Sequence, residues 1–126
     1  MKYACLGYYD ENAFEAIPAS EQEALIQKCF DYDDHLKRNG HFVDGVALQG
    51  ADTAMTVRGS RGKAVVTDGP YAETKEVLGG ILVMEADDLN HAVQLMSKHP
   101  GLAFGFFEIR PLDEAITARA KERPGA

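Results

Sequence analysis

The densest group of residues that could do chemistry lies between Thr67 and Glu76. This stretch reads Thr-Asp-Gly-Pro-Tyr-Ala-Glu-Thr-Lys-Glu and leads directly into an apolar segment. Asp-Gly-Pro is typical of a turn, because Asp bonds to nearby backbone, Gly tolerates positive φ and Pro presets φ near about −65°. The ionisable residues of the stretch are Asp68, Glu73, Lys75 and Glu76. That is more charge than a turn needs, and residues 67–76 are called the charged turn below.

The charged turn offers three chemical roles. Asp68 can act as a general base, or orient one, if it is partly desolvated. Lys75 can hold a substrate carboxylate or an enolate oxygen, and Tyr71 can donate a hydrogen bond. A plainer interpretation stays open for each: Asp68 as a turn former, and Glu73, Lys75 and Glu76 as an ordinary solvated loop.

Four further candidates lie on segments expected to be strands: Tyr8, His41, Glu108 and Arg110. Arg110 offers the bidentate geometry that suits a carboxylate, and Glu108 lies two residues away on the same strand face. These two residues can equally form an ordinary ion pair. His41 is a candidate catalytic group, but its place directly after Gly40 also suits a structural role.

The elements that must position these residues follow from the hydrophobic pattern. Residues 2–8 alternate as a strand, with Ala4, Leu6 and Tyr8 on one face and Tyr3 and Cys5 on the other. Ser20 and Glu23 match a capping box, which predicts a helix from there to about residue 39. Its apolar stripe consists of Leu25, Cys29, Tyr32 and Leu36.

The rest of the chain alternates between strand and helix patterns. Residues 41–49 predict a strand with a bulge at Asp44-Gly45, and residues 53–58 and 63–67 predict a hairpin through Gly59–Gly62. Residues 81–85 predict a central strand, because they are apolar on both faces. Asp87 or Asp88 is expected to cap a second helix ending near residue 98, before a last strand at 104–110.

This order predicts an α+β fold: a ferredoxin-like split βαβ plait with an inserted β-hairpin and both helices on one face of the sheet. The uncovered face would carry the Ile81–Met84 segment, which is too apolar for contact with water. We therefore expect homodimerisation through that face. Residues 1–111 are expected to form a single domain, and residues 112–126 a charged tail.

Composition excludes several classes of protein. The 126 residues carry a net charge of −7, and the basic residues are not clustered into a stripe, so direct nucleic-acid binding is not expected. No apolar stretch approaches the ~20 residues of a membrane span, and no signal peptide is evident, so we expect a cytoplasmic protein. Cys5 and Cys29 have no metal-ligand spacing, and neither do His91 and His99, so no metal is expected.

The charged turn closely resembles the signature of the DGPF group of YCII-related proteins, whose usual wording is Asp-Gly-Pro-Phe-Ala-Glu-Thr-Lys-Glu. Only Tyr71 departs from it, keeping the ring and adding a hydroxyl. Thr53-Ala54-Met55-Thr56-Val57-Arg58 also resembles a segment of that group. The resemblance covers roughly residues 1 to 111, and it implies a dimeric α/β barrel.

The resemblance implies two kinds of function. One is binding or transforming a small carbonyl- or carboxylate-type metabolite in the barrel cavity without a cofactor, by analogy with lactone isomerases and cofactor-independent monooxygenases. In that site Asp68, His41 and Lys75 would be catalytic, and Tyr8, Tyr71, Glu73, Glu76, Glu108 and Arg110 would bind the ligand. The other is a regulatory module for an extracytoplasmic-function sigma factor. Whether the protein is an enzyme stays open.

One feature of the wider YCII group does not carry over to this chain. That group is thought to use a His–Asp pair whose His lies near the start of the first helix. No His occurs between Met1 and Cys29. The resemblance therefore supplies no His partner for Asp68.

Overall fold

The computed structural model describes residues 1–125 and contains two β-sheets and four α-helices. The elements in chain order are β1 (Lys2–Tyr9), α1 (Glu11–Glu15), α2 (Ala19–Arg38), β2 (Phe42–Ala47), the 3-10 helix η1 (Ala51–Thr53), β3 (Met55–Ser60), β4 (Lys63–Asp68), β5 (Val77–Glu85), α3 (Leu89–Met96), the 3-10 helix η2 (Pro100–Ala103), β6 (Gly105–Pro111) and α4 (Glu114–Glu122). No helix within residues 1–125 is long and apolar enough to cross a membrane.

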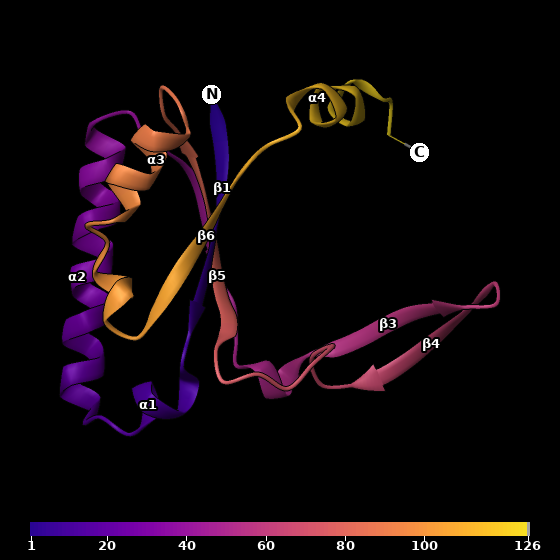
Figure 1. Ribbon diagram of the computed structural model, residues 1–126, viewed down its shortest axis with the longest axis horizontal. Helices are drawn as coiled ribbons and strands as arrows, with labels where there is room; N and C mark the ends of the chain where they lie inside the picture. Colours follow the sequence, from indigo (N-terminus) through magenta and orange to yellow (C-terminus); the bar gives the residue numbers. More distant parts are fainter. Residues whose placement is uncertain (126) are drawn as a thin grey trace.

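The main sheet confirms the predicted fold class. Its four strands lie in the order β2-β5-β1-β6, and every neighbouring pair is antiparallel. With β3 and β4 set aside as an inserted hairpin, this is the strand order of a ferredoxin-like plait. Helices α2 and α3 both cover the same face of the sheet (Figure 1).

The hydrophobic core lies between the sheet and these two helices. The sheet contributes buried Tyr3, Cys5, Leu82 and Met84, and helix α2 contributes Leu36, which is fully buried. Tyr3 and Cys5 were predicted to share one face of the first strand, and they do. The helix-covered face is therefore the one filled by alternate residues of β1 and β5.

No helix within residues 1–125 covers the other face of the sheet, called the open face below. Strand register places Leu6 beside Ile81 and Glu108, and Ala4 beside Val83 and Arg110. Side chains of directly opposite residues point to the same face of a sheet. The centre of the open face is thus apolar, and charged residues lie along β6. Val46, which pairs with Ile81, is 56% exposed.

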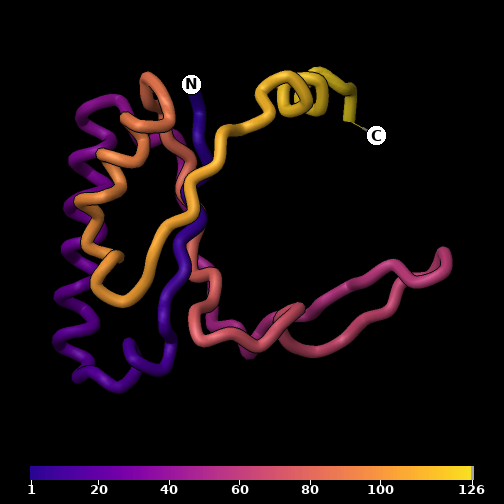
Figure 2. Tube along the Cα trace, in the orientation of Figure 1, coloured from indigo at the N-terminus to yellow at the C-terminus, as the bar shows by residue number. Residues whose placement is uncertain are grey.

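Two segments project beyond the open face. The β3–β4 hairpin leaves from one end of the sheet and α4 leaves from the other, both on the side away from α2 and α3 (Figures 1 and 2). Every residue of β4 is exposed, and so is every residue of β3 except Thr56. The open face lies between the two projections.

The structure corrects three local predictions. Residues 11–15 form helix α1, capped by Asp10, where a polar connection was expected. Helix α2 begins at Ala19 behind Pro18 and its N-cap makes no side-chain hydrogen bond, so the capping box of Ser20 and Glu23 is wrong. The side chain of Gln22 instead donates to the carbonyls of Phe14 and Ile17, which joins α2 to α1.

The third correction concerns the hairpin turn. The turn consists of Arg61 and Gly62 alone, with φ of 51° and 79°. Positive φ at both central residues is what a tight two-residue hairpin turn requires. The strands therefore continue through Gly59 and Ser60, which had been assigned to the loop.

Strand β5 begins at Val77, four residues before the predicted central strand, but three other predictions agree with the structure. Asp88 caps α3 by accepting a hydrogen bond from the His91 amide, as one of the two predicted caps. The strand register of β2 shifts between Phe42 and Asp44, close to the predicted bulge. The charged tail contains α4, capped by Asp113.

Candidate functional site

The charged turn lies at the base of the hairpin: its first two residues end β4, and its last residue directly precedes β5. Its backbone is held by three hydrogen bonds to β3 and to Ala54, the residue before that strand. The Gly69 amide donates to the Ala54 carbonyl at 2.7 Å, and the Thr56 hydroxyl donates to the Gly69 carbonyl at 2.8 Å. Arg58 Nη2 donates to the Tyr71 carbonyl at 3.0 Å. Gly69 has a φ of 88°, which a residue with a Cβ rarely adopts, so a glycine is needed there.

The side chains of the charged turn point largely into solvent in the single chain. Tyr71 is 77% exposed, Asp68, Glu73 and Lys75 are exposed, and Glu76 is half-buried. Two concave surfaces of the chain lie elsewhere, one along α4 and one between α3 and β6, and neither is lined by the charged turn. A working site at the charged turn therefore needs something else to enclose it.

Strands β1 and β6 bring the other open-face candidates together. The rings of Tyr8 and Phe106 are stacked, with centroids 5.1 Å apart and planes 13° apart. Two residues along β6 from Phe106, Glu108 Oε1 accepts a hydrogen bond from Arg110 Nη2 at 3.2 Å. Both groups remain accessible, since the side chains of Arg110 and Glu108 are 72% and 49% exposed. The stacked rings of Tyr8 and Phe106, called the aromatic platform below, thus lie beside a carboxylate and a guanidinium.

The aromatic platform lies at the same end of the sheet as the charged turn. Tyr8 pairs with Leu78, the second residue of β5, and Glu76 directly precedes that strand. Tyr8, Phe106 and the charged turn therefore share one end of the open face. Glu108 and Arg110 lie further along the sheet, on its outermost strand.

His41 lies at the opposite end. Its backbone carbonyl accepts from the Glu85 amide, at the far end of β5 from the charged turn. Eight residue steps of about 3.3 Å separate the two ends of that strand, which is roughly 26 Å. The structure of one chain therefore does not bring His41 near Asp68 or Lys75.

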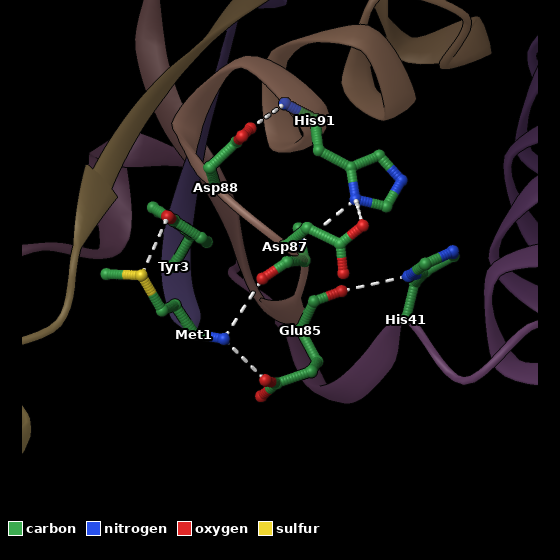
Figure 3. A network of polar contacts seen from close by, with 8 residues as sticks. Met1, Tyr3, His41, Glu85, Asp87, Asp88 and His91 are labelled. Carbon is green, nitrogen blue, oxygen red and sulfur yellow. Dashed lines mark hydrogen bonds and ion pairs between the residues drawn. The ribbon is translucent and has the colours of Figure 1, made fainter.

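His41 belongs to a polar network around the N-terminus (Figure 3). Its Nδ1 lies 2.9 Å from the Glu85 carbonyl, so Nδ1 carries the proton and donates. His91 lies beside it, with ring centroids 5.1 Å apart, and its Nδ1 accepts from the Asp87 amide at 3.0 Å. The terminal amine of Met1 donates to Glu85 Oε1 at 2.6 Å, and this ion pair lowers the pKa of the Glu85 carboxyl.

The His41–His91 pair is a poor metal site. A neutral imidazole that binds metal through Nε2 must carry its proton on Nδ1. His91 cannot do so while its Nδ1 accepts the Asp87 amide proton. Within residues 1–125, no three His, Cys, Asp or Glu side chains gather as metal ligands would.

The helix-covered face contains a His–Asp pair that sequence reasoning missed. His99 is buried, and its Nε2 lies 3.1 Å from Asp33 Oδ1. Its Nδ1 accepts from the Gly101 amide at 2.9 Å, so the Nε2 proton is the one donated to Asp33. Both ring nitrogens are occupied and the rings of Tyr32 and Phe107 pack edge-on, so His99 has no free lone pair for base catalysis. We assign this pair a structural role.

The two cysteines are also unsuited to catalysis. Burial raises the pKa of the Cys5 thiol to about 11, and burial followed by the charge of Asp33 raises the pKa of the Cys29 thiol. The thiolate is the reactive form of cysteine, so both residues stay in their unreactive form near neutral pH. Cys5 is buried and Cys29 half-buried, so both act as small packing residues.

Two residues near the candidate site were not identified from the sequence, although strand alternation could have revealed one of them. Phe106 follows the same alternation as Glu108 and Arg110, which places it on the open face. Arg58 was noted only as part of a resembling segment, and its bond to the Tyr71 carbonyl crosses from β3 to the charged turn. Only the folded hairpin brings those two residues together.

Comparison with known proteins gives consistent results. The profile of the YCII-related domain matches residues 1–116. An uncharacterized protein of Rhizobium meliloti (strain 1021) is 32% identical over 116 residues, which cover 89% of this chain and 92% of that protein.

A solved structure with the same fold is that of 5-chloro-2-hydroxyhydroquinone dehydrochlorinase from Burkholderia phenoliruptrix AC1100, in complex with 2,5-dihydroxybenzoquinone. It superposes with a TM-score of 0.56 at 13% identity, covering 90% of this chain and 94% of that one. At that identity the likeness concerns the fold alone. The family profile covers most of the chain, and with the strand order and the braced Asp-Gly-Pro turn it leads to one conclusion: this chain belongs to the YCII-related domain family.

Proposed function

We propose that two copies pair through their open faces and that the cavity between them binds, or transforms, a small metabolite bearing a carbonyl or carboxylate group. One observation carries the proposal: the sheet face that no helix covers is apolar at its centre and carries polar groups at one end and one edge. An apolar sheet face needs a cover, and a second copy with the same face supplies one. The cavity so formed would be lined by the candidates already described.

The aromatic platform suggests how a ligand would be oriented. Aromatic side chains stack on flat rings, so Tyr8 and Phe106 suit a planar, oxygen-bearing ring. The bound 2,5-dihydroxybenzoquinone of the Burkholderia enzyme is a molecule of that kind, which supports this ligand class by analogy of fold. Arg110 and Lys75 would then bind the anionic oxygen of the ligand.

The charged turn supplies the groups for a reaction. Asp68 would remove a proton from the carbon next to the ligand carbonyl, and the electron pair of that C–H bond would move onto the carbonyl oxygen as an enolate. Lys75 or Arg110 would stabilise the enolate oxygen, and Tyr71 would donate a hydrogen bond to it. Glu73, Glu76 and Glu108 would contact other polar groups of the ligand. His41, at the far end of the sheet, has no part in this scheme within one chain.

Two measurements test the proposal. Sedimentation equilibrium should find a dimer. A thermal-shift screen against hydroxylated quinones, benzoates and lactones should find a ligand that raises the Tm of the wild type but not of Asp68→Asn, because binding to the native state stabilises it. Asp52→Asn is the matched control, since Asp52 is an exposed acid on η1, outside the charged turn. A monomer, or equal shifts in all three proteins, would contradict the proposal.

The alternative function is a regulatory module for a sigma factor. It rests on the family resemblance alone, and no contact within residues 1–125 supports it separately. Recovery of a sigma factor or an RNA polymerase subunit with the tagged protein, without any ligand found in the screen, would place this alternative first.

A further inference from the structure

The β3–β4 hairpin has two chemically different faces. Register pairs Val57 with Val66 and Gly59 with Ala64, and these pairs share one largely apolar face with Met55 and, at the base of the hairpin, its partner Asp68. The other face carries Thr56, Thr67, Arg58, Val65, Ser60 and Lys63. The apolar face is not covered: Met55, Val57 and Val66 are 60%, 66% and 56% exposed. An isolated two-stranded hairpin is marginally stable in water, so this one requires a partner surface.

The length of the hairpin shows how far it reaches into a second copy. Each strand has six residues, which at about 3.4 Å per residue gives an arm of roughly 20 Å. Two sheets packed face to face lie only about 10 Å apart. An arm that projects from the open face therefore passes the partner's sheet and ends level with the partner's helix layer, since a helix is about 10–12 Å across (Figure 1).

The tip of the hairpin is basic in an acidic protein. The hairpin, residues 55–68, contains Arg58, Arg61 and Lys63, and its one acid, Asp68, lies at the base, although the whole chain has a net charge of −7. Residues 10–27, which include α1 and the start of α2, show the opposite bias. They contain five acidic residues and no Lys or Arg: Asp10, Glu11, Glu15, Glu21 and Glu23.

These two charged regions lie at the same end of the subunit. Helix α1 and the base of the hairpin are both at the lower end of the molecule in Figure 1. A direct contact confirms this, because Glu11 Oε1 accepts from the Ala51 amide at 2.7 Å, just before β3 begins. The opposite end of the helix layer is mixed in charge, with Lys37 and Arg38 ending α2 and Asp87 and Asp88 preceding α3.

We propose that the β3–β4 hairpin is an inter-subunit arm, whose basic tip docks on the acidic α1–α2 start of a second copy. Complementary charges fix the orientation of an interface. Here they select a two-fold axis parallel to the strands, because that axis keeps the hairpin-bearing ends of both copies together. An axis across the strands would bring each tip to the mixed end. This inference rests on the face-to-face dimer proposed above, and it adds the orientation of the two copies.

Charge reversal with rescue tests the contact. Arg61→Asp combined with Lys63→Glu should raise the Kd for dimer dissociation about tenfold, because each dimer has two such contacts. Asp tolerates the positive φ at position 61. Glu15→Lys with Glu23→Lys should weaken it similarly, and combining all four changes should restore it to within about threefold. The matched control is Arg38→Glu with Lys98→Glu, two exposed residues of the helix layer outside the acidic segment. It changes the charge equally and should leave the Kd nearly unchanged.

Cross-linking provides an independent readout. A carbodiimide should join Lys63 to Glu15, Glu21 or Glu23 of the other copy, which mixed isotope-labelled dimers identify by mass spectrometry. Links from Lys63 to Asp87 or Glu114 of the other copy would instead establish the other axis. That result, or a dimer indifferent to reversal of the tip charges, would overturn the arm and leave the proposed cavity standing. A wild-type monomer would overturn both.

Discussion

The two faces of the main sheet are both apolar, but they differ in how far their side chains are removed from water. On the helix-covered face, Tyr3, Cys5, Leu82 and Met84 pack against α2 and α3 and are almost fully removed from water. On the open face, Leu6, Ile81 and Val83 alternate with them along the same strands and remain half-exposed. Side-chain alternation makes both faces apolar, but the chain supplies helices for only one.

The polar groups of the two faces also differ in their hydrogen bonding and exposure. On the helix-covered face, His99 has a partner for each ring nitrogen. On the open face, Arg110 and Glu108 bond to each other but remain accessible, and the charged turn points into solvent. Saturated polar groups stabilise a fold, whereas accessible ones are free to bind a ligand. The contrast locates the candidate site on the open side.

The strongest test of this contrast compares two neighbours on β5. Met84→Ala should lower the free energy of unfolding by about 2–5 kcal/mol at any protein concentration, because it leaves a cavity in a closed core. Val83→Ala, on the opposite face, should cost less in dilute solution and more at concentrations where a dimer forms. Urea unfolding at two protein concentrations measures both. Equal, concentration-independent losses would show that the open face is not an interface.

The next test removes the buried imidazole. His99→Ala should lower the free energy of unfolding by about 1–3 kcal/mol, because the Gly101 amide loses its acceptor in a partly buried turn. Asp33→Asn is the matched control, since its amide oxygen still accepts from Nε2 and only the charge is lost. It should cost clearly less in the same urea unfolding experiment. If neither variant shifts the unfolding midpoint, the structural role of the pair is wrong.

The pH dependence of the free energy of unfolding tests the burial of Cys5 on the helix-covered face. Its pKa rises from 9.0 to about 11 on folding because burial disfavours the thiolate. Between pH 9 and 11 the unfolded chain therefore releases a proton that the folded chain keeps, so the free energy of unfolding falls as pH rises. Comparing Cys5→Ala with the wild type at pH 8 and pH 10.5 isolates this effect. The variant should lose less stability over that interval, and an identical loss would refute the assignment.

The smallest expected effect concerns the charged turn. Arg58→Met removes the hydrogen bond to the Tyr71 carbonyl, an exposed contact, and should cost less than about 1 kcal/mol. Hydrogen exchange of residues 69–76 should nevertheless become faster, because one of three bonds that hold the turn is lost. Arg61→Met, on the same hairpin, is the control and should leave exchange in the turn unchanged.

Local patterns in the sequence predicted much of the fold. The alternation of Tyr3 and Cys5 against Ala4 and Leu6 placed β1 correctly, and the acidic pair before Leu89 supplied the cap of α3. The errors were also local. Residues 11–15 form a helix because Asp10 caps them, and Ser20 does not cap α2 because the helix starts two residues earlier than a Ser20 cap requires. Such boundaries depend on competing caps of similar energy.

The candidate site could be predicted only in part. Glu108 and Arg110 meet because they lie two residues apart on one strand, which a sequence reveals. His41 and the charged turn proved to lie at opposite ends of β5, and Asp33 and His99 meet across 66 residues of sequence. Such distances depend on how strands and helices pack.

The sequence by itself therefore determined the family, the strand and helix types and the Asp-Gly-Pro turn, because these depend on residue identity and on periods of 2.0 and 3.6 residues. Only the tertiary structure decided which candidates share an end of the sheet, that His99 is locked between Asp33 and Gly101, and that the hairpin and α4 project on the open side. These features arise from contacts between segments far apart in the chain, which no local pattern encodes.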